Sequence, residues 1–153
     1  MRKFDHFESM ADLPRVHARE RPDQVALVFE DRATTFADFD RHTSQVAQAL
    51  IANGRRPQSR VAYLGKNSDL YFELLLGAIK ARVVLVGVNW RLAVPEISYI
   101  LNDAQCEMLF VGPEYHALVP ALRAECPSLV EVVAMEGGLD GAAAFTAWRD
   151  AQP

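Results

Sequence analysis

Residues 74–102 decide the fold, and their sequence is LLLGAIKARVVLVGVNWRLAVPEISYILN. Residues 83–88 form an unbroken apolar run, with helical periodicity on both sides of it. Such a run is typical of a buried parallel strand whose two faces are both covered by helices. Functional loops lie at the carboxyl ends of parallel strands. Here that loop covers residues 87–92 and contains Arg91.

The chain repeats this alternation from residue 60 onward. Strands are predicted at residues 60–64, 83–88, 107–111 and 129–134. Helices are predicted at residues 69–81, from Pro95 at its first position, at 114–125 with a kink or division at Pro120, and at 142–150 as a last short helix or tail. Because crossovers between strands are right-handed, the strands should lie parallel with their carboxyl ends on one rim.

The segment before residue 60 has a different pattern. A short helix should end at Arg21, which precedes a proline, and residues 24–35 favour a small hairpin. Thr35 has the features of a helix N-cap, and Gly54 should close that helix in a left-handed conformation. We therefore predict an α/β fold with a mostly parallel sheet, alternating helices and a small N-terminal hairpin.

The composition of the chain limits the classes of function that it can have. The chain has 153 residues, half of them hydrophobic, which suits one domain with a single core. A net charge of -4 with scattered lysines and arginines gives no footprint for nucleic acid. Cys106 and Cys126 lack any paired spacing and fit structural thiols of a reduced protein. Without a signal peptide core or a run of roughly 20 apolar residues, a cytoplasmic location is expected.

No catalytic or metal-binding motif can be found along the chain. The glycines spell neither G-x-G-x-x-G nor a P-loop, the four histidines have no metal-ligand spacing, and no G-x-S-x-G elbow is present. The sequence therefore predicts no catalytic residue and no metal ligand.

Lys66 and Arg91 are the candidate binding residues. Each follows a predicted strand, so both should project from the same rim, where a guanidinium suits a phosphate. The alternative, that each makes only solvated or local ion-pair contacts, has equal weight on these grounds. Trp90 could stack on a ligand ring, although an aromatic residue at a strand end more often serves packing.

Three segments resemble the adenylate-forming superfamily, which includes acyl-CoA synthetases, luciferases and the adenylation domains of peptide synthetases. They are RPDQVALV with TFADF (residues 21–28 and 35–39), RVA with KNS (60–62 and 66–68), and IKA, VNWRL and YILND (79–81, 88–92 and 99–103). Asn89 with Arg91 and Leu92 resembles acyl-CoA synthetases more than peptide-synthetase domains.

The resemblance implies the reaction and its reactants. Residues 1–153 would be the N-terminal segment of the large N-terminal domain of an acyl-CoA synthetase, without the nucleotide-binding loop and the C-terminal domain. The intact enzyme would use ATP, Mg and CoA to convert a carboxylic or fatty acid to acyl-AMP and then to a thioester, with Arg91 near the CoA phosphates. The segment alone should be inactive, bind no cofactor and pair with the remainder of the synthetase chain, or self-associate through exposed apolar surface.

Two residues within 74–102 depart from the family pattern. Arg82 stands where the family has glycine at a helix end, so the helix is expected to end by another geometry. Gly87 stands where the family has proline, which should loosen the turn into Asn89.

Two alternatives stay open. The chain could be a complete, non-catalytic α/β binding or interaction module, or a truncated relative that only dimerises or occupies a partner synthetase. A segment of a larger domain should expose apolar surface that a complete module would cover.

Overall fold

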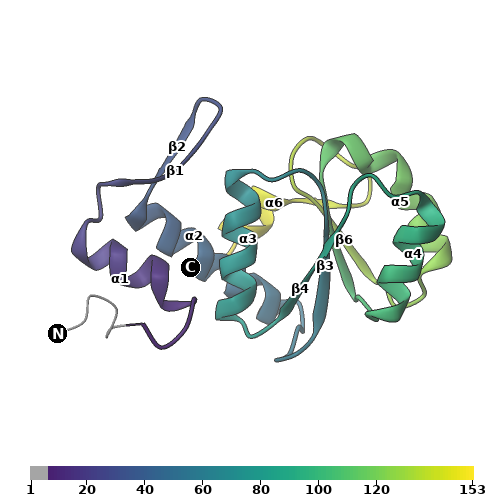
Figure 1. Cartoon of the computed structure of the whole chain (residues 1–153), viewed down its shortest axis with the longest axis horizontal. Helices are drawn as coiled ribbons and strands as arrows, with labels where there is room; N and C mark the ends of the chain where they lie inside the picture. The colour runs from purple at the N-terminus through teal and green to yellow at the C-terminus, as the bar shows by residue number, and fades with distance from the viewer. Residues whose placement is uncertain (1–6) are drawn as a thin grey trace.

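A five-stranded parallel sheet forms the centre of the molecule in a computed structural model that describes residues 7–153 (Figure 1). The strands lie in the order β4-β3-β5-β6-β7, and every neighbouring pair is parallel. Their bounds are β3 Arg60–Leu64, β4 Val84–Val88, β5 Met108–Val111, β6 Glu131–Ala134 and β7 Ala143–Ala144. The predicted α/β class and parallel sheet are confirmed.

Helices cover both faces of this sheet. One layer contains α2 (Phe36–Ala52), α3 (Asp69–Lys80) and α6 (Phe145–Asp150), and the other contains α4 (Val94–Asp103) and α5 (Val119–Glu125) after the 3-10 turn Pro113–Leu118 (Figure 1). Alternate residues of β3 divide between the two layers: Val61 and Tyr63 face α2 and α3, whereas Ala62 and Leu64 face α4 and α5. The central strands β3, β5 and β6 are thus largely buried on both faces.

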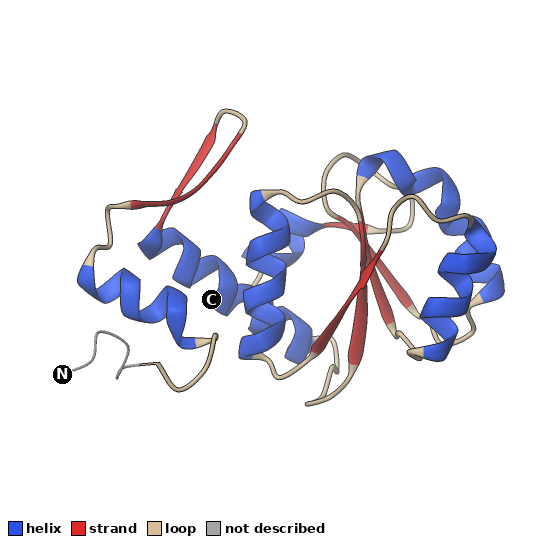
Figure 2. Ribbon diagram, in the orientation of Figure 1, coloured by secondary structure: helices blue, strands red, loops and turns tan. Residues whose placement is uncertain are grey.

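The N-terminal segment lies beside the α2 and α3 layer. Helix α1 (Asp12–Glu20) packs on α2, and strands β1 (Val25–Phe29) and β2 (Arg32–Thr35) form the predicted antiparallel hairpin, which projects away from the sheet (Figure 2). The guanidinium of Arg32 donates to both carboxylate oxygens of Asp69 over 2.9 and 2.7 Å. This bidentate pair joins the hairpin to the first turn of α3.

Helix ends follow several predicted signals. Thr35 accepts from the backbone N–H of Asp38 over 3.1 Å, and Ser68 accepts from that of Tyr71 over 3.2 Å, so both are N-caps. Gly54 has φ +81 and closes α2, as predicted. Pro120 divides its segment into the 3-10 turn and α5, as expected. Pro95 differs slightly, since α4 begins one residue earlier at Val94.

The main differences between the predicted and the observed structure lie in residues 74–102. Strand β4 is an edge strand with only one neighbour, and Val84 is 40% exposed, so its prediction as a buried strand was wrong. Arg82 adopts the left-handed conformation, with φ +60, so the expectation of another helix ending was also wrong. Gly87 lies within β4 rather than in the turn.

Two smaller features were missed by sequence reasoning. Tyr99 lies on the outer side of α4 and is 71% exposed. The two-residue strand β7 extends the sheet beyond β6, and its length is too short for any periodicity to predict it. None of the helices within residues 7–153 is long and apolar enough to span a membrane.

Candidate functional site at the carboxyl end of the sheet

A crevice opens where the strand order of the sheet reverses. The chain leaves β3 through α3 to reach β4 on one side, and then returns through α4 to β5 on the other side of β3. Such a switch point is where ligands bind in open α/β sheets. A hollow of about 450 Å³ lies there. It is lined by Tyr63 of β3, by segments that follow three strands (66–68 after β3, 112–114 after β5 and 135–136 after β6), and by residues 29–30 of the hairpin.

Two glycines allow the close approach of the loops at this crevice. The backbone N–H of Gly112 donates to the carbonyl of Leu64 over 2.9 Å. A Cβ on Gly65 would lie 2.7 Å from the phenolic oxygen of Tyr63, so no larger residue fits without displacing that ring. The Tyr63 hydroxyl donates to the carbonyl of Lys66, and burial raises the pKa of this phenol. This hydrogen bond from Tyr63 thus holds the loop that carries Lys66 in place.

The rim of the crevice brings Lys66 and Arg91 to the same aromatic ring. The Arg91 guanidinium carbon lies 4.5 Å from the centre of the Trp90 ring, and Lys66 Nζ lies 5.7 Å from it. Both cations therefore project from the rim on which sequence reasoning placed them. Whether they bind a phosphate is a separate question, which the geometry of the rim leaves as a prediction.

The loop that carries Arg91 has a defined turn. The side-chain oxygen of Asn89 accepts from the backbone N–H of Arg91 over 3.1 Å, and its carbonyl accepts from that of Leu92 over 3.2 Å. Glu96, in the first turn of α4, then accepts from the N–H of Ala93 over 2.9 Å. Asn89 holds Arg91 at the surface by these local contacts.

Trp90 contributes more than packing. Its ring lies 6.4 Å from that of Tyr115, so one part of it packs against the segment after β5. The residue nevertheless stays 37% exposed, and its ring makes cation–π contacts with Lys66 and Arg91. The expectation that it serves mainly as packing therefore accounts for only one side of the ring.

The two basic residues differ in their electrostatic partners. Lys66 pairs with Glu114 over 3.1 Å, which raises the pKa of the lysine. The pKa of Glu114 is lowered by its own backbone N–H and then by Lys66. Arg91 has no carboxylate partner within residues 7–153. Sequence reasoning missed Glu114, because the pairing depends on β3 and β5 being neighbours in the sheet.

The described part of the chain offers little for covalent or metal chemistry. It holds no group of three His, Cys, Asp or Glu residues that could bind a metal ion. Cys106 and Cys126 are free and fully buried, and burial raises the pKa of Cys106 to about 11 and that of Cys126 as well. Both thiols stay protonated and serve packing, as predicted. His6 lies outside the described residues.

The chain belongs to the AMP-binding enzyme family, whose model matches residues 14–152. It is 35% identical over 142 residues to the fatty acid--[acyl-carrier-protein] ligase ScoC of Streptomyces coeruleorubidus, covering 93% of this chain and 26% of that protein. It is 37% identical over 117 residues to a feruloyl-CoA synthase of Amycolatopsis sp, covering 76% of this chain and 24% of that protein.

Solved structures agree with this assignment. The anthranilate CoA ligase AuaEII, solved with anthranoyl-AMP, superposes with a TM-score of 0.89 at 29% identity over all of this chain and 30% of its own. The N-terminal domain of FACL13 from Mycobacterium tuberculosis gives a TM-score of 0.85 at 25% identity, over 96% of this chain and 36% of its own. The chain thus spans about a quarter of the length of the curated relatives that it matches.

Proposed function

We propose that residues 1–153 are the N-terminal segment of the large N-terminal domain of an acid–CoA ligase. The full enzyme would use ATP to convert a carboxylic or fatty acid to acyl-AMP and would then transfer the acyl group to the thiol of CoA. The similarity to acyl-CoA and acyl-carrier-protein ligases supports this proposal, as does the likeness to the N-terminal domain of FACL13.

The observation that carries the CoA assignment is the unpaired Arg91 beside Trp90 on the carboxyl-end rim. An exposed guanidinium without a carboxylate partner is free to donate to a phosphate of CoA. Lys66 is already neutralised by Glu114, so its contribution should be smaller. Trp90 holds the guanidinium against its face and limits its freedom before CoA binds.

ATP and Mg fit this segment less well than CoA does. Residues 7–153 supply no carboxylate cluster for a divalent cation, and the sequence has no glycine-rich phosphate loop. We therefore expect the ligands of ATP and Mg, and the acyl pocket, on the remainder of the ligase, for which this segment supplies part of the scaffold. Two buried free thiols suit a cytoplasmic enzyme.

Exposed apolar residues support packing against the remainder of the ligase. Val84 on the open edge of β4 is 40% exposed, Val28 on the projecting hairpin is 71% exposed, and Val130 before β6 is 71% exposed. An open sheet edge with apolar side chains readily pairs with another chain. We expect the isolated segment to self-associate through the open edge of β4, whereas a complete interaction module would cover such apolar residues.

A direct test is ATP–pyrophosphate exchange with the purified 153-residue chain. We expect no exchange with fatty, aromatic or short-chain acids, because the residues that bind ATP lie elsewhere. A ligase in which residues 1–153 are followed by the rest of the large domain and the C-terminal domain serves as the positive control. Exchange by the isolated chain would refute the assignment as a non-catalytic segment.

The thiol acceptor is a separate part of the proposal. The name of the Streptomyces relative gives an acyl carrier protein as acceptor, whereas those of the feruloyl and anthranilate relatives give CoA. A phosphate contact at Arg91 suits either acceptor, since the phosphopantetheine arm of a carrier protein also carries a phosphate, and CoA offers further phosphates on its nucleotide. Thioester formation assayed with CoA and with a carrier protein in parallel separates the two, and a ligase that forms no thioester with CoA would exclude the role of Arg91 proposed here.

A further inference from the structure

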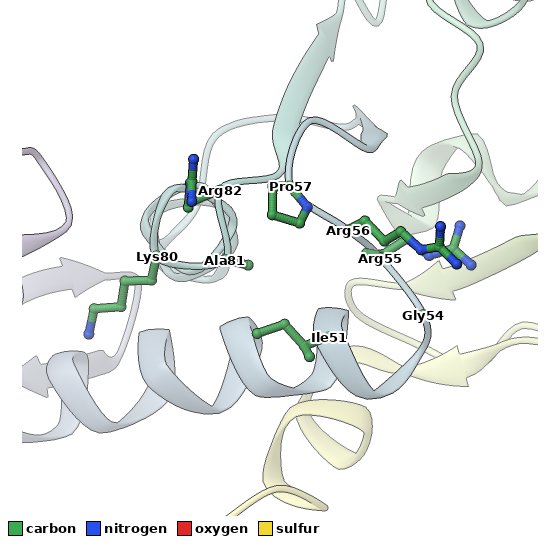
Figure 3. Close-up of a pocket in the computed structure, with 8 residues that line it drawn as sticks. All are labelled: Ile51, Gly54, Arg55, Arg56, Pro57, Lys80, Ala81 and Arg82. Atoms are coloured by element: carbon green, nitrogen blue, oxygen red, sulfur yellow. The ribbon is translucent and has the colours of Figure 1, made fainter.

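A second hollow lies at the opposite, amino-terminal end of the sheet, far from the rim in the strand direction. It has a volume of about 560 Å³ and opens between the last turns of α2 and α3 and the turn that precedes β3 (Figure 3). Its lining residues are Ile51, Gly54, Arg55, Arg56, Pro57, Lys80, Ala81 and Arg82. The rim residues Lys66, Trp90 and Arg91 are not among those that line this hollow.

The backbone around the hollow is firmly held. Helices α2 and α3 pack closely, since a Cβ on Gly77 would lie 2.4 Å from Val46 Cγ1. The N–H of Gln58 donates to the carbonyl of Arg82 over 2.8 Å, and the N–H of Val84 donates to that of Ser59 over 2.9 Å. These bonds join the turn before β3 to the turn before β4. A partner would therefore meet a preformed surface and would pay little to order it.

The hollow has an apolar base. Ile51 lies on the last turn of α2, across the hollow from Ala81 and Pro57, and is 59% exposed (Figure 3). A large β-branched side chain at this exposure leaves apolar surface in water that a partner's apolar side chain could cover. The base therefore favours an apolar anchor.

The basic residues around the hollow divide into two kinds. Arg55 pairs with Glu107, and Lys80 pairs with Asp40, so their charges are already balanced. The side chains of Arg56 and Arg82 have no hydrogen-bonding or ion-pair partner within the described range 7–153. They are therefore available cations in a chain whose net charge is -4.

The directions of these two side chains restrict the ligand. Figure 3 shows Arg82 and Arg56 pointing away from the hollow on different sides of it. They do not converge, as they would to clamp a single phosphate. They are placed to meet two separate anionic groups on a surface wider than the hollow. A concave base also suits a protruding side chain better than a flat membrane surface.

Arg82 has a further property that suggests a role. Its φ of +60 is a conformation in which glycine costs less by about 1 kcal/mol, yet the position carries a long, unpaired cation. Strain of this kind concentrates at functional positions. The exposed charge offers a reason for an arginine at this helix end.

We propose that this hollow docks an acidic segment of a partner protein, which inserts one apolar side chain over Ile51 and places Asp or Glu residues against Arg56 and Arg82. The opposite charges would orient the segment and raise its association rate, and the apolar anchor would slow its dissociation. Because the hollow lies at the other end of the strands from the rim, a docked segment would leave the crevice open. This proposal does not depend on the acid–CoA ligase assignment.

The probe is a fluorescein-labelled peptide that carries one leucine between two clusters of glutamate. Its binding is measured by fluorescence anisotropy, both with the 153-residue chain and with the ligase of which the chain forms the first segment. We expect Ile51→Ser and the double variant Arg56→Glu/Arg82→Glu each to weaken binding by about tenfold or more. Arg82→Gly removes the charge in a conformation that glycine favours, so it should weaken binding by about threefold without any loss of folding. A peptide with serine in place of the leucine should bind as weakly as the wild-type peptide binds Ile51→Ser.

Arg19→Glu is the matched control, since Arg19 is exposed on α1, away from the hollow, and should change binding by less than about twofold. Equal weakening by Arg19→Glu would mean general charge attraction and would overturn the proposal. So would binding that is insensitive to the hollow variants, absence of binding, binding to anionic phosphatidylglycerol vesicles in place of the peptide, or binding to the isolated chain but not to the longer ligase.

Discussion

Arg82 is one of the non-glycine residues that adopt a left-handed conformation in the described chain. Its N–H donates to the carbonyl of Ile79 over 3.0 Å, and the N–H of Val83 donates to that of Ala78 over 2.9 Å. This pair of bonds is a Schellman motif, which requires a left-handed residue and usually has glycine there. Gln105, with φ +53, occupies the same position at the end of α4. The end of α2 has the same pair of bonds around Gly54: the N–H of Gly54 donates to the carbonyl of Ile51, and the N–H of Arg55 donates to that of Leu50.

Arg82→Gly should therefore stabilise the chain by about 1 kcal/mol, because glycine has no Cβ to clash with the backbone in this conformation. The free energy of unfolding in urea measures the gain. Gly54→Arg is the mirror control and should destabilise by a similar amount. A loss of stability in Arg82→Gly would show that the arginine side chain makes a contact that outweighs the backbone cost.

Glu131 is the residue whose ionisation opposes folding. It begins β6, and burial raises the pKa of its carboxyl above the ordinary value of 4.5, with Arg55 acting in the opposite direction. The folded chain therefore holds this proton more tightly than the unfolded chain, so the associated stability exists at low pH and is lost as pH rises through the folded pKa.

Glu131→Gln should raise the melting temperature at pH 7 and lose this advantage below the ordinary carboxyl pKa. Glu114→Gln should instead lower the melting temperature at pH 7, because the pKa of Glu114 is lowered in the folded chain. The ionised carboxylate therefore stabilises the fold at neutral pH, and this contribution is lost as pH falls through the folded pKa. Melting temperatures of both variants across pH check the assignment. If both variants shift in the same direction at pH 7, the burial argument for Glu131 is wrong.

Helix α6 shows how an element far along the chain is held at the sheet. Phe145 and Trp148 pack on Phe110 of β5, with ring centres 6.1 and 5.4 Å away. Arg149 donates to Glu73 of α3, and both side chains are almost completely buried. The second carboxylate oxygen of Glu73 lies 2.8 Å from Nδ1 of His42 on α2.

Arg149→Met should destabilise the chain by about 3 kcal/mol, since it leaves the buried Glu73 carboxylate without its permanent cation. The double variant Arg149→Met/Glu73→Gln should recover part of that loss. Arg41→Met, which removes the exposed pair with Asp38, is the control and should cost less than about 1 kcal/mol. Urea unfolding measures all three, and a cost below about 1 kcal/mol for Arg149→Met would show that α6 is held by its aromatic residues alone.

Elements with local signals were predictable from the sequence, and those that depend on neighbours were not. Thr35, Gly54 and Pro120 set helix boundaries by their own chemistry, and each acts as expected. An apolar run such as that of β4 looks the same in an edge strand and in a central strand, because its position is decided by the order of the whole sheet.

In the candidate site, too, one part was predictable from the sequence and another was not. Lys66 and Arg91 could be placed on one rim, since parallel strands end on the same side. The pairing of Lys66 with Glu114 and the shared Trp90 ring depend on β3 lying between β4 and β5, which no local pattern in the sequence reports.

The whole molecule has two ends with different chemistry. The carboxyl end of the sheet carries the crevice, Trp90 and the unpaired Arg91, and the amino end carries the apolar hollow with Arg56 and Arg82. The parallel direction of all five strands separates these two surfaces. A ligase built on this segment could bind CoA at one end while a partner occupies the other.

The central claim is that Arg91 binds a phosphate of CoA in the second half-reaction, and steady-state kinetics of the ligase that contains residues 1–153 test it most directly. Arg91→Ala should raise the KM for CoA by about tenfold, as expected for a lost hydrogen bond to a charged group of about 1.5 kcal/mol. ATP–pyrophosphate exchange should stay unchanged, and Lys66→Ala should change the KM for CoA by less than about twofold because Glu114 already neutralises that lysine. An unchanged KM for CoA in Arg91→Ala, or an equal loss of pyrophosphate exchange, would contradict the account.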